Sequence, residues 1–334
     1  MVYIYRKRIG DKNYYYLRAS TKKDGKAITK DIAYLGTDLN KINKKLDSLT
    51  EYSKEIRKAY KTIKGFVETN RYLEKVRSLR IKRDLFLSKE SLYDVEACKL
   101  HWRQEFQKLD ELTKSEILKH FIIEFAFNTA SIEGNTITLK QAQKLLLENL
   151  TPKNKTLREI YDLQNTEKVF LKLYDDLKQE LDHKLICEVH DSLLENIDKR
   201  KGYRTEDVRV FKMNFKSTPA KYVKADMELL LGWYEKNKNK LHPLVLATMF
   251  HHKFEKIHPF MDGNGRTGRM LMNFILLKNN YPPVIIRKKN RTEYLEKLNK
   301  ADECDLNKTE TKHYQDLTEF TSFEMKDNYW NIFL

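Results

Sequence analysis

Residues 258–269 read His-Pro-Phe-Met-Asp-Gly-Asn-Gly-Arg-Thr-Gly-Arg and run directly into an apolar helical segment over residues 270–277. Gly263 and Gly265 allow positive φ angles and let successive backbone N–H groups approach a ligand closely. The helix that follows directs the positive end of its dipole to the same place. The stretch therefore predicts an anion cradle, built by the backbone at the start of a helix.

Four charged or titratable side chains in this stretch narrow the anion to a polyphosphate. Arg266 and Arg269 are three residues apart, on one helix face, where both guanidinium groups can pair with phosphate oxygens. Asp262 would repel a phosphate unless a hard divalent cation, Mg²⁺, bridges the two. His258 can take a proton from an attacking hydroxyl near neutral pH. A simple helix cap would leave the arginines and the aspartate unexplained.

The pattern His-Pro-Phe-x-Asp-Gly-Asn-Gly-Arg-x-x-Arg resembles the signature of Fic proteins, which typically transfer AMP from ATP to a hydroxyl side chain of a target protein. Every fixed position is present. The resemblance implies that His258 is the general base and that Asp262 is the Mg²⁺ ligand. Gly265 argues against the kinase-like branch of the fold, which typically carries lysine at that position. The residues that the resemblance implies for nucleotide binding are Gly263, Asn264, Gly265, Arg266, Thr267, Gly268 and Arg269.

The composition excludes several other classes of protein. No run of eighteen apolar residues occurs, and the N-terminus lacks an apolar segment with a cleavage site, so neither a membrane partner nor secretion is expected. Cys98, Cys187 and Cys304 are scattered, and they predict neither a disulfide framework nor a zinc site. A cytoplasmic location is the expectation that follows.

The formal charge of +16 is concentrated in the first quarter of the chain. Residues 1–90 hold 24 Lys/Arg and 11 Asp/Glu, a net charge of +13, whereas residues 91–334 hold 40 and 37, a net charge of +3. A surface of this kind attracts nucleic acid or an acidic protein. A lysine-rich solvated face explains the composition at least as well, so both interpretations stay open.

Residues 2–35 predict a small three-stranded antiparallel sheet. Val2–Arg8 and Asn13–Arg18 alternate around a Gly-Asp turn, and Ala27–Tyr34 follows a Lys-Asp-Gly turn. The consecutive tyrosines Tyr14–Tyr16 lie among basic residues, where aromatic rings can stack on bases. The favoured interpretation is that alternate tyrosines pack one face of the sheet.

Residues 41–79 predict one or two long helices, because apolar residues recur there at helical spacing with little punctuation. Gly65 is the expected break. The helices suit a docking arm, a homodimerising surface or a linker, and the sequence does not choose among them. The basic stretch Arg77–Arg83 marks the junction with the main domain.

An amphipathic helix is predicted over Leu112–Ile132, and Thr138 with Gln141 forms a capping box for the next helix, Leu139–Asn149. Glu133 falls at the C-terminus of the first helix, where the dipole disfavours an anion by about a few tenths of a kcal/mol, so it needs a cationic partner. The segment also resembles the inhibitory motif Thr/Ser-x-x-x-Glu-Gly of Fic proteins. This resemblance implies that Glu133 pairs with Arg269 and keeps ATP from binding productively.

The residue pattern changes over residues 202–218, where Val208 and Val210 alternate with other residues, and this change predicts a short hairpin. The segment resembles the Fic flap, which clamps a target segment by strand-like pairing. The docking edge that this resemblance implies is Val208, Arg209, Val210 and Phe211. The alternative is an ordinary exposed hairpin.

The helices flanking the signature carry further candidates. Helices are expected over Leu244–Lys256, beginning at Pro243, and over Arg291–Ala301. His251 and His252 are adjacent and lack metal-ligand spacing, so core packing or a surface role is favoured. Gly268 costs its helix about 1 kcal/mol relative to alanine, which indicates close helix packing. Tyr294 and Asp302 fall where the Fic family lines its adenine pocket.

The expected fold class is mainly α: a Fic-fold helical core with a β-hairpin flap, preceded by a small antiparallel β plus helical extension. The boundaries are 1–90 for the basic extension, 91–320 for the core and 321–334 for a C-terminal tail. Within the core lie the inhibitory helix 112–133, the flap 202–218 and the signature 258–269. Helices are also expected over Leu157–Leu181, His183–Ile197 and Tyr222–Tyr234.

The expected activity is protein adenylyltransfer from ATP with Mg²⁺, onto a Tyr, Thr or Ser hydroxyl of a target protein or of the chain itself. Two alternatives stay open. Glu133 could orient a water that removes AMP from a modified target. The chain could also be a nucleic-acid-binding regulator in which the Fic unit senses a nucleotide and the basic N-terminus is the effector.

Overall fold

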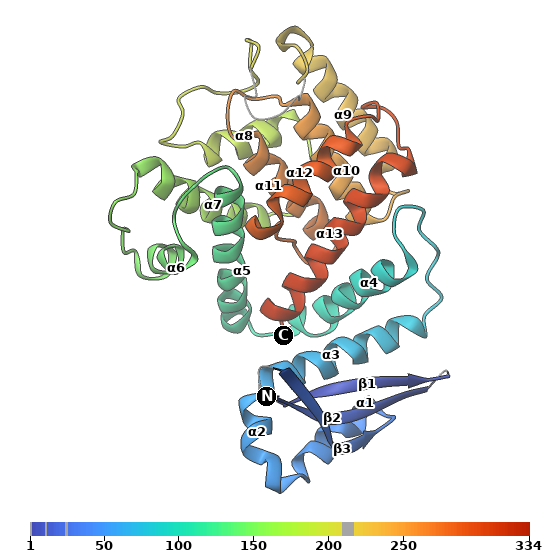
Figure 1. Ribbon diagram of the computed structural model, residues 1–334. Helices are drawn as coiled ribbons and strands as arrows, with labels where there is room; N and C mark the ends of the chain where they lie inside the picture. The colour runs from blue at the N-terminus through green and yellow to red at the C-terminus, as the bar shows by residue number, and fades with distance from the viewer. Residues whose placement is uncertain (1, 11, 24–25, 209–216) are drawn as a thin grey trace. The chain divides into compact units, whose positions relative to one another are not determined.

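The computed structural model describes residues 2–10, 12–23, 26–208 and 217–334. The chain divides into two compact units, one formed by Met1–Ile81 with Leu334 and the other by Lys82–Phe333 (Figure 1). The division falls inside the basic stretch Arg77–Arg83, before the boundary expected at residue 90.

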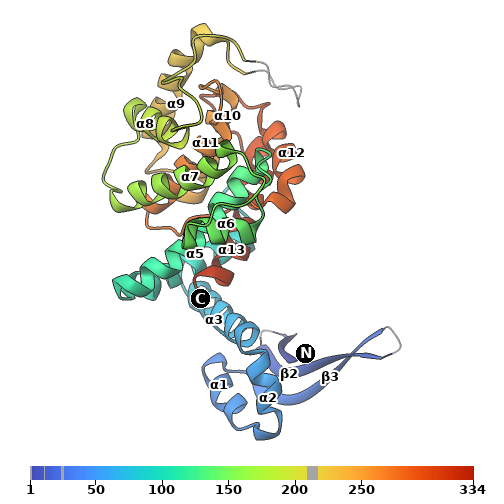
Figure 2. The same cartoon turned by 90° about the vertical axis from the view of Figure 1, so that its left-hand side faces the viewer.

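The N-terminal unit contains the expected antiparallel sheet. Its strands are β1 (Val2–Ile9), β2 (Lys12–Lys23) and β3 (Lys26–Gly36), in the order β1-β2-β3. Gly10 adopts φ 57° in the β1–β2 turn, a conformation that glycine takes without steric cost. Helices α1 (Leu39–Asp47), α2 (Ser53–Lys58) and α3 (Tyr60–Arg77) follow, and they lie to one side of the sheet in Figure 2.

The expectation of one or two long helices over residues 41–79 is wrong, because the segment folds into three. Gly65 lies inside α3 and does not break it. The apolar stripes of α1 (Leu39, Ile42) and α3 (Ile63, Val67) share one core with the sheet. A continuous helix of this length would extend roughly 58 Å and could not return its second stripe to so small a sheet.

The larger unit is a bundle of helices around α10 (Pro243–Ile257), twelve of whose residues are buried. Helix α11 (Asn264–Lys278) packs along α10 and is buried almost throughout. The remaining helices of this unit are α4 (Lys89–Gln104), α5 (Glu111–Ile132), α6 (Leu139–Glu148), α7 (Leu157–Asp175), α8 (His183–Leu193), α9 (Val223–Asn237), α12 (Arg291–Ala301) and α13 (Thr311–Ile332). Short 3₁₀ turns in the two units are Thr50–Tyr52, Phe106–Lys108, Ala220–Tyr222 and Lys288–Asn290.

Local sequence signals set most of these helix ends. The Thr138 hydroxyl accepts from the Gln141 N–H while the Gln141 side chain binds the Thr138 N–H, so the predicted capping box is confirmed. Asp110 caps α5 by accepting from the Thr113 N–H. At the other end of α5, Glu133 is the C-cap and the following Gly134 adopts φ 104°.

Three expected boundaries are wrong. The helices expected over Leu157–Leu181 and His183–Ile197 end earlier, at Asp175 and Leu193. The boundary expected between residues 320 and 321 falls inside α13, so residues 321–334 do not form a separate tail. The cause is burial, since buried side chains such as Tyr314, Phe320 and Tyr329 occur along the whole length of α13. In the described part of the chain, no helix combines the length and the apolar character needed to cross a membrane.

The expected flap is described only at its base. Val208 is partly buried and lies in irregular structure after residues 202–207. Arg209, Val210 and Phe211 lie outside the described residues, so the docking edge stays a prediction.

Candidate active site

The signature stretch forms the loop between α10 and α11. His258 is the C-cap of α10 in the left-handed conformation (φ 55°), and Gly263 is the N-cap of α11 with φ 76°. The Asn264 side chain accepts from the Phe260 N–H (2.9 Å) and donates to the Phe260 carbonyl (2.8 Å). Asn264 therefore holds the loop closed with both polar atoms of its side chain, while the first turn of α11 presents the backbone N–H groups of an anion site.

The backbone at His258 is held by the side chain and the main chain of the buried Arg204. Arg204 donates from Nε to the His258 carbonyl (2.8 Å), and its N–H donates to the Pro259 carbonyl (2.9 Å). Burial, followed by the positive charge of Arg204, lowers the pKa of His258 to about 4, while a hydrogen bond to the Glu255 backbone favours the protonated ring. The imidazole is therefore neutral at physiological pH and can act as a proton acceptor.

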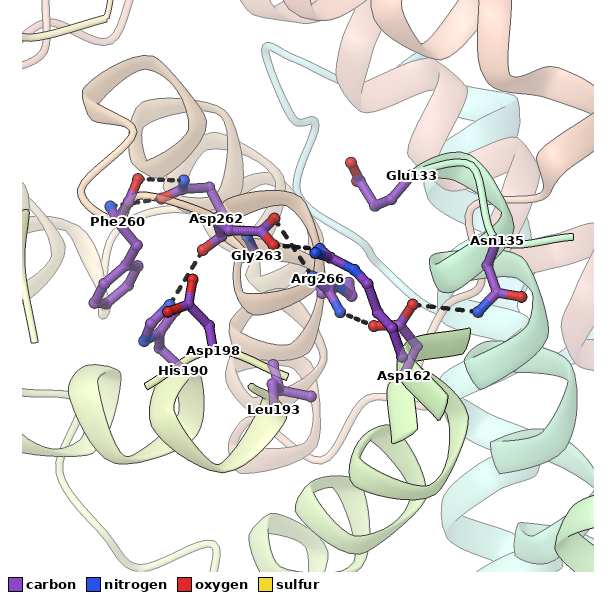
Figure 3. A network of polar contacts seen from close by, with 12 residues as sticks. Glu133, Asn135, Asp162, His190, Leu193, Asp198, Phe260, Asp262, Gly263 and Arg266 are labelled. Atoms are coloured by element: carbon purple, nitrogen blue, oxygen red, sulfur yellow. Dashed lines mark hydrogen bonds and ion pairs between the residues drawn. The ribbon is translucent and has the colours of Figure 1, made fainter. Parts of the chain in front are cut away.

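Alternating charges surround the start of α11. Arg266 lies between Asp162 of α7 and Asp262, as Figure 3 shows, and it forms an ion pair with each; the pair to Asp262 is 3.5 Å long. Asp162 also accepts from the Asn135 side chain at 3.2 Å. Arg158 pairs with the other oxygen of Asp262. The Arg266 guanidinium, 3% exposed, is thus fixed at the mouth of the cradle.

Asp262 is the acidic side chain that the sequence assigns to a metal. Burial opposes its ionisation, but Arg266 and Arg158 outweigh that effect, so the pKa of Asp262 lies below its ordinary value. Among the described residues, no group of three or more His, Cys, Asp or Glu side chains is arranged to hold a metal. A single ionised carboxylate suits Mg²⁺ delivered by a nucleotide, because that ion keeps its waters and binds substrate phosphates. The donor set therefore fits a Mg²⁺–nucleotide complex and does not fit a resident metal centre.

Arg269 and Glu133 form the ion pair that the inhibitory motif implied. The Arg269 Nη2 to Glu133 Oε1 distance is 2.7 Å, and Arg269 also donates to the Thr129 hydroxyl (2.8 Å) and carbonyl (3.1 Å). Burial opposes ionisation of Glu133, but Arg269 outweighs it and lowers the pKa of that carboxyl. The Glu133 carboxylate also lies against Gly265, where a Cβ atom would collide with it. Glu133 thus occupies the space beside the glycine turn.

Thr267 and Gly268 face the interior. Thr267 has no exposed surface. A Cβ atom at Gly268 would lie 2.6 Å from His251 Nδ1 and 3.0 Å from Glu255 Oε1, so the predicted close packing at Gly268 is confirmed. Burial raises the pKa of Glu255 to about 8, an effect that the charge of Arg269 opposes.

Tyr294 and Asp302 are both tied to the adjacent histidines of α10. The hydroxyl of Tyr294 hydrogen-bonds to His251 Nε2. Burial raises the pKa of Tyr294, and the charge of the nearby Arg269 opposes that effect. Asp302 Oδ1 lies 2.9 Å from His252 Nε2. Both histidines are 1% exposed, so of the two roles left open for them core packing is the one observed. Tyr294 borders the Arg269 side of the site, whereas the Asp302 side chain serves as a partner of His252.

Three residues at the site were missed by sequence analysis. Arg158, Asp162 and Arg204 lie far from the signature along the chain, yet they contact Asp262, Arg266 and the His258 backbone. Their spacing carries no motif. The change of residue pattern that begins at Gly202-Tyr203-Arg204 was the one local indication, and it predicted the start of the flap without predicting a role for Arg204.

A pocket of about 360 Å³ lies beside Asp262. Its lining includes Arg200, Tyr203, Arg204 and Met261, together with the His190 ring, which stacks on Phe260 at 3.6 Å. His190 Nε2 lies 3.1 Å from the Asp262 carbonyl oxygen, as Figure 3 also shows. The pocket leads from solvent to the side of the loop that carries Asp262.

The chain is similar to a known family and to several known proteins. Residues 180–276 match the sequence profile of the Fic/DOC family. A protein adenylyltransferase Fic from Drosophila grimshawi is 32% identical over 195 residues, which are 56% of this chain and 40% of the relative. The protein adenylyltransferase fic-1 from Caenorhabditis elegans is 29% identical over 210 residues, which are 61% and 41% of the two chains. The chain thus spans about two fifths of the length of these curated relatives.

Solved structures share the fold. A Fic domain containing signaling protein from Bacteroides thetaiotaomicron superposes with a TM-score of 0.64 at 25% identity, over 71% of this chain and 95% of the other. A Fic family protein from Desulfovibrio desulfuricans superposes with a TM-score of 0.59 at 25% identity, over 74% and 75% of the two chains. The expected fold class, a Fic-fold helical core after a small antiparallel sheet, is confirmed.

Proposed function

Because this chain contains a Fic domain, we propose that it is a protein adenylyltransferase that moves AMP from ATP to a Tyr, Thr or Ser hydroxyl of a target protein. The hydroxyl oxygen forms a bond to the α-phosphorus, and the bond from that phosphorus to the leaving pyrophosphate breaks. His258 takes the proton of the hydroxyl. The pyrophosphate leaves with the negative charge of the broken bond.

The observation that carries this proposal is a neutral imidazole beside a helix N-terminus flanked by two buried arginines. The pKa of His258, about 4, keeps the ring unprotonated at neutral pH. Arg266 and Arg269, 3% and 2% exposed, supply positive charge in a site of low dielectric. Mg²⁺, when it is bound with ATP at Asp262, would offset phosphate charge. Positioning and electrostatics account for most of the expected rate gain.

The proposal includes restraint by Glu133. Its carboxylate is bonded to Arg269 and lies against Gly265, so it competes with a phosphate both for the guanidinium and for space. A glutamate and a phosphate at one arginine would repel each other. The resting chain should therefore bind ATP weakly and transfer AMP slowly.

Incubation of the whole chain with α-³²P-ATP, Mg²⁺ and a cell lysate, read by gel and mass spectrometry, tests the activity. Glu133→Gly should label the chain itself or a target more strongly than the unaltered chain. A second incubation of the purified chain with γ-³²P-ATP and without lysate should give no label, because the γ-phosphate leaves in pyrophosphate. Label from γ-³²P-ATP would contradict AMP transfer and indicate a kinase.

A further inference from the structure

The two faces of the N-terminal sheet differ sharply in what covers them. One face packs on α1 and α3 through a core that includes Val2, Ile4, Tyr15 and Leu17. Tyr15 has no exposed surface, and its hydroxyl donates to Glu74 of α3 at 3.0 Å. Because successive side chains of a strand point to opposite faces, the neighbours of these residues lie on the other face.

Tyrosines dominate this other face, which we call the open face. Tyr16 pairs with Tyr5 of β1 on one side and with Tyr34 of β3 on the other, so the three form a row across the strands. The rings of Tyr16 and Tyr34 are 5.3 Å apart, and Tyr14 lies 6.5 Å from Tyr34. Tyr34 keeps 48% of its surface exposed. In Figure 2, no helix of this unit lies over the open face, as far as the described residues show.

This arrangement agrees with the interpretation favoured from the sequence, in which alternate tyrosines pack one face of the sheet. The helices cover the opposite face, which carries Tyr15. Tyr34 is exposed and Tyr5, Tyr14 and Tyr16 are partly buried, so this face still presents aromatic surface to solvent.

Cations are interleaved with these rings. The Arg18 guanidinium lies 3.6 Å from the Tyr5 ring centroid while its Nε is bonded to Asp31. Lys7 pairs with Tyr14 across the strands, and Lys45 Nζ lies 5.3 Å from the Tyr34 ring. Residues 1–90 carry a net charge of +13, so the open face belongs to the most basic part of the chain.

We propose that the open face of the sheet, formed by Tyr5, Tyr14, Tyr16, Tyr34 and Lys7, binds single-stranded nucleic acid. Unpaired bases expose flat faces that stack on tyrosine rings, and the flanking cations meet the phosphates. The row across three strands spans roughly 10 Å, which is enough for a platform that stacks two or three bases. A duplex hides its base faces, and an acidic protein surface would use the cations without needing the rings.

The test measures binding of the whole chain to a fluorescein-labelled 20-nucleotide oligonucleotide by anisotropy at low salt. The expected result is saturable binding to single-stranded DNA or RNA, with the matching duplex bound at least several-fold more weakly. Replacing Tyr5, Tyr16 and Tyr34 together by threonine, which keeps strand propensity, should weaken binding at least about tenfold. The corresponding phenylalanine variant should bind like the unaltered chain, because its rings still stack.

Two controls separate stacking from charge and from folding. Tyr60→Ala changes a 62% exposed tyrosine on α3 and should leave binding unchanged. Lys7→Gln should reduce the slope of log K against log salt by roughly 0.7, whereas the threonine variant should keep the slope. Tyr34→Thr alone, at the half-exposed edge strand, is least able to disturb the fold and should also weaken binding. Absence of saturable binding, equal binding of the threonine variant, or equal binding of the duplex would each overturn the proposal.

Discussion

Replacing Glu133 by glycine should destabilise the chain and activate it at the same time. Arg269 is 2% exposed, whereas the Glu133 side chain keeps 44% of its surface. Their ion pair therefore lies between an exposed pair, worth about 0–1 kcal/mol, and a buried pair, whose breakage costs about 3–5 kcal/mol. Allowing for solvent screening, we expect a loss of about 1–3 kcal/mol. Thr129 still holds Arg269 in the variant, so the guanidinium should stay in place.

The measurement is thermal unfolding with and without Mg·ATP. For a unit of this size, the loss should lower Tm by roughly 2–10 °C without nucleotide. Saturating Mg·ATP should then raise the Tm of the variant more than that of the unaltered chain, because a ligand at about 100 times its Kd contributes about 2.7 kcal/mol. AMP transfer measured with α-³²P-ATP should rise in parallel.

Two further variants separate charge from bulk. Glu133→Gln removes the charge but keeps a side chain against Gly265, so it should activate less than Glu133→Gly. Arg269→Ala should not activate, because it removes the phosphate partner together with the restraint. A double-mutant cycle of the two positions should give a coupling energy above ~1 kcal/mol. An Mg·ATP stabilisation equal in Glu133→Gly and the unaltered chain would refute restraint by this pair.

His258→Ala should stay folded and bind nucleotide but lose about 10²–10⁴-fold in transfer rate; unchanged transfer would remove its role as base. The kcat/KM of the Glu133→Gly variant should hold down to about pH 5, because the base must be neutral, its pKa is about 4 in the unaltered chain, and removal of the Glu133 charge lowers it further. An acidic limb near 6.5 would contradict this. Asp262→Ala should weaken Mg²⁺-dependent ATP binding measured by calorimetry, and equal Mg²⁺ dependence would show that the metal is held elsewhere. Gly268→Ala should lower the free energy of unfolding, measured by chemical denaturation, by about 1–3 kcal/mol, because its Cβ meets His251. Gly232→Ala in α9 places its Cβ in open space and should leave stability unchanged or raise it. Equal effects of the two changes would refute the packing argument.

The free energy of unfolding should also depend on pH in the acid range. Burial lowers the pKa of His190, His251, His252 and His258 below the ordinary value of about 6.5. Below about pH 6.5, these histidines therefore bind protons in the unfolded chain but stay neutral in the folded chain. These histidines make the free energy of unfolding decline as the pH falls from about 6.5 toward 4.

The signature loop and many helix ends could be predicted from the sequence, because they depend on interactions between neighbouring residues. Glycine turns, a proline at the first helical position and the Thr138–Gln141 capping box depend on neighbours within about four residues. The Glu133–Arg269 pairing came from resemblance to a family, because the two residues are 136 positions apart.

Folding brings together the distant side chains that complete the site. Arg158, Asp162 and Arg204 reach the signature from other segments, and no periodicity within those segments records a contact across 50 to 100 residues. The same limit applies to the N-terminal sheet. Alternation shows that Tyr15 and Tyr16 point to opposite faces, but the return path of α1 and α3 determines which face is buried. That choice follows from packing between elements, which local sequence pattern does not encode.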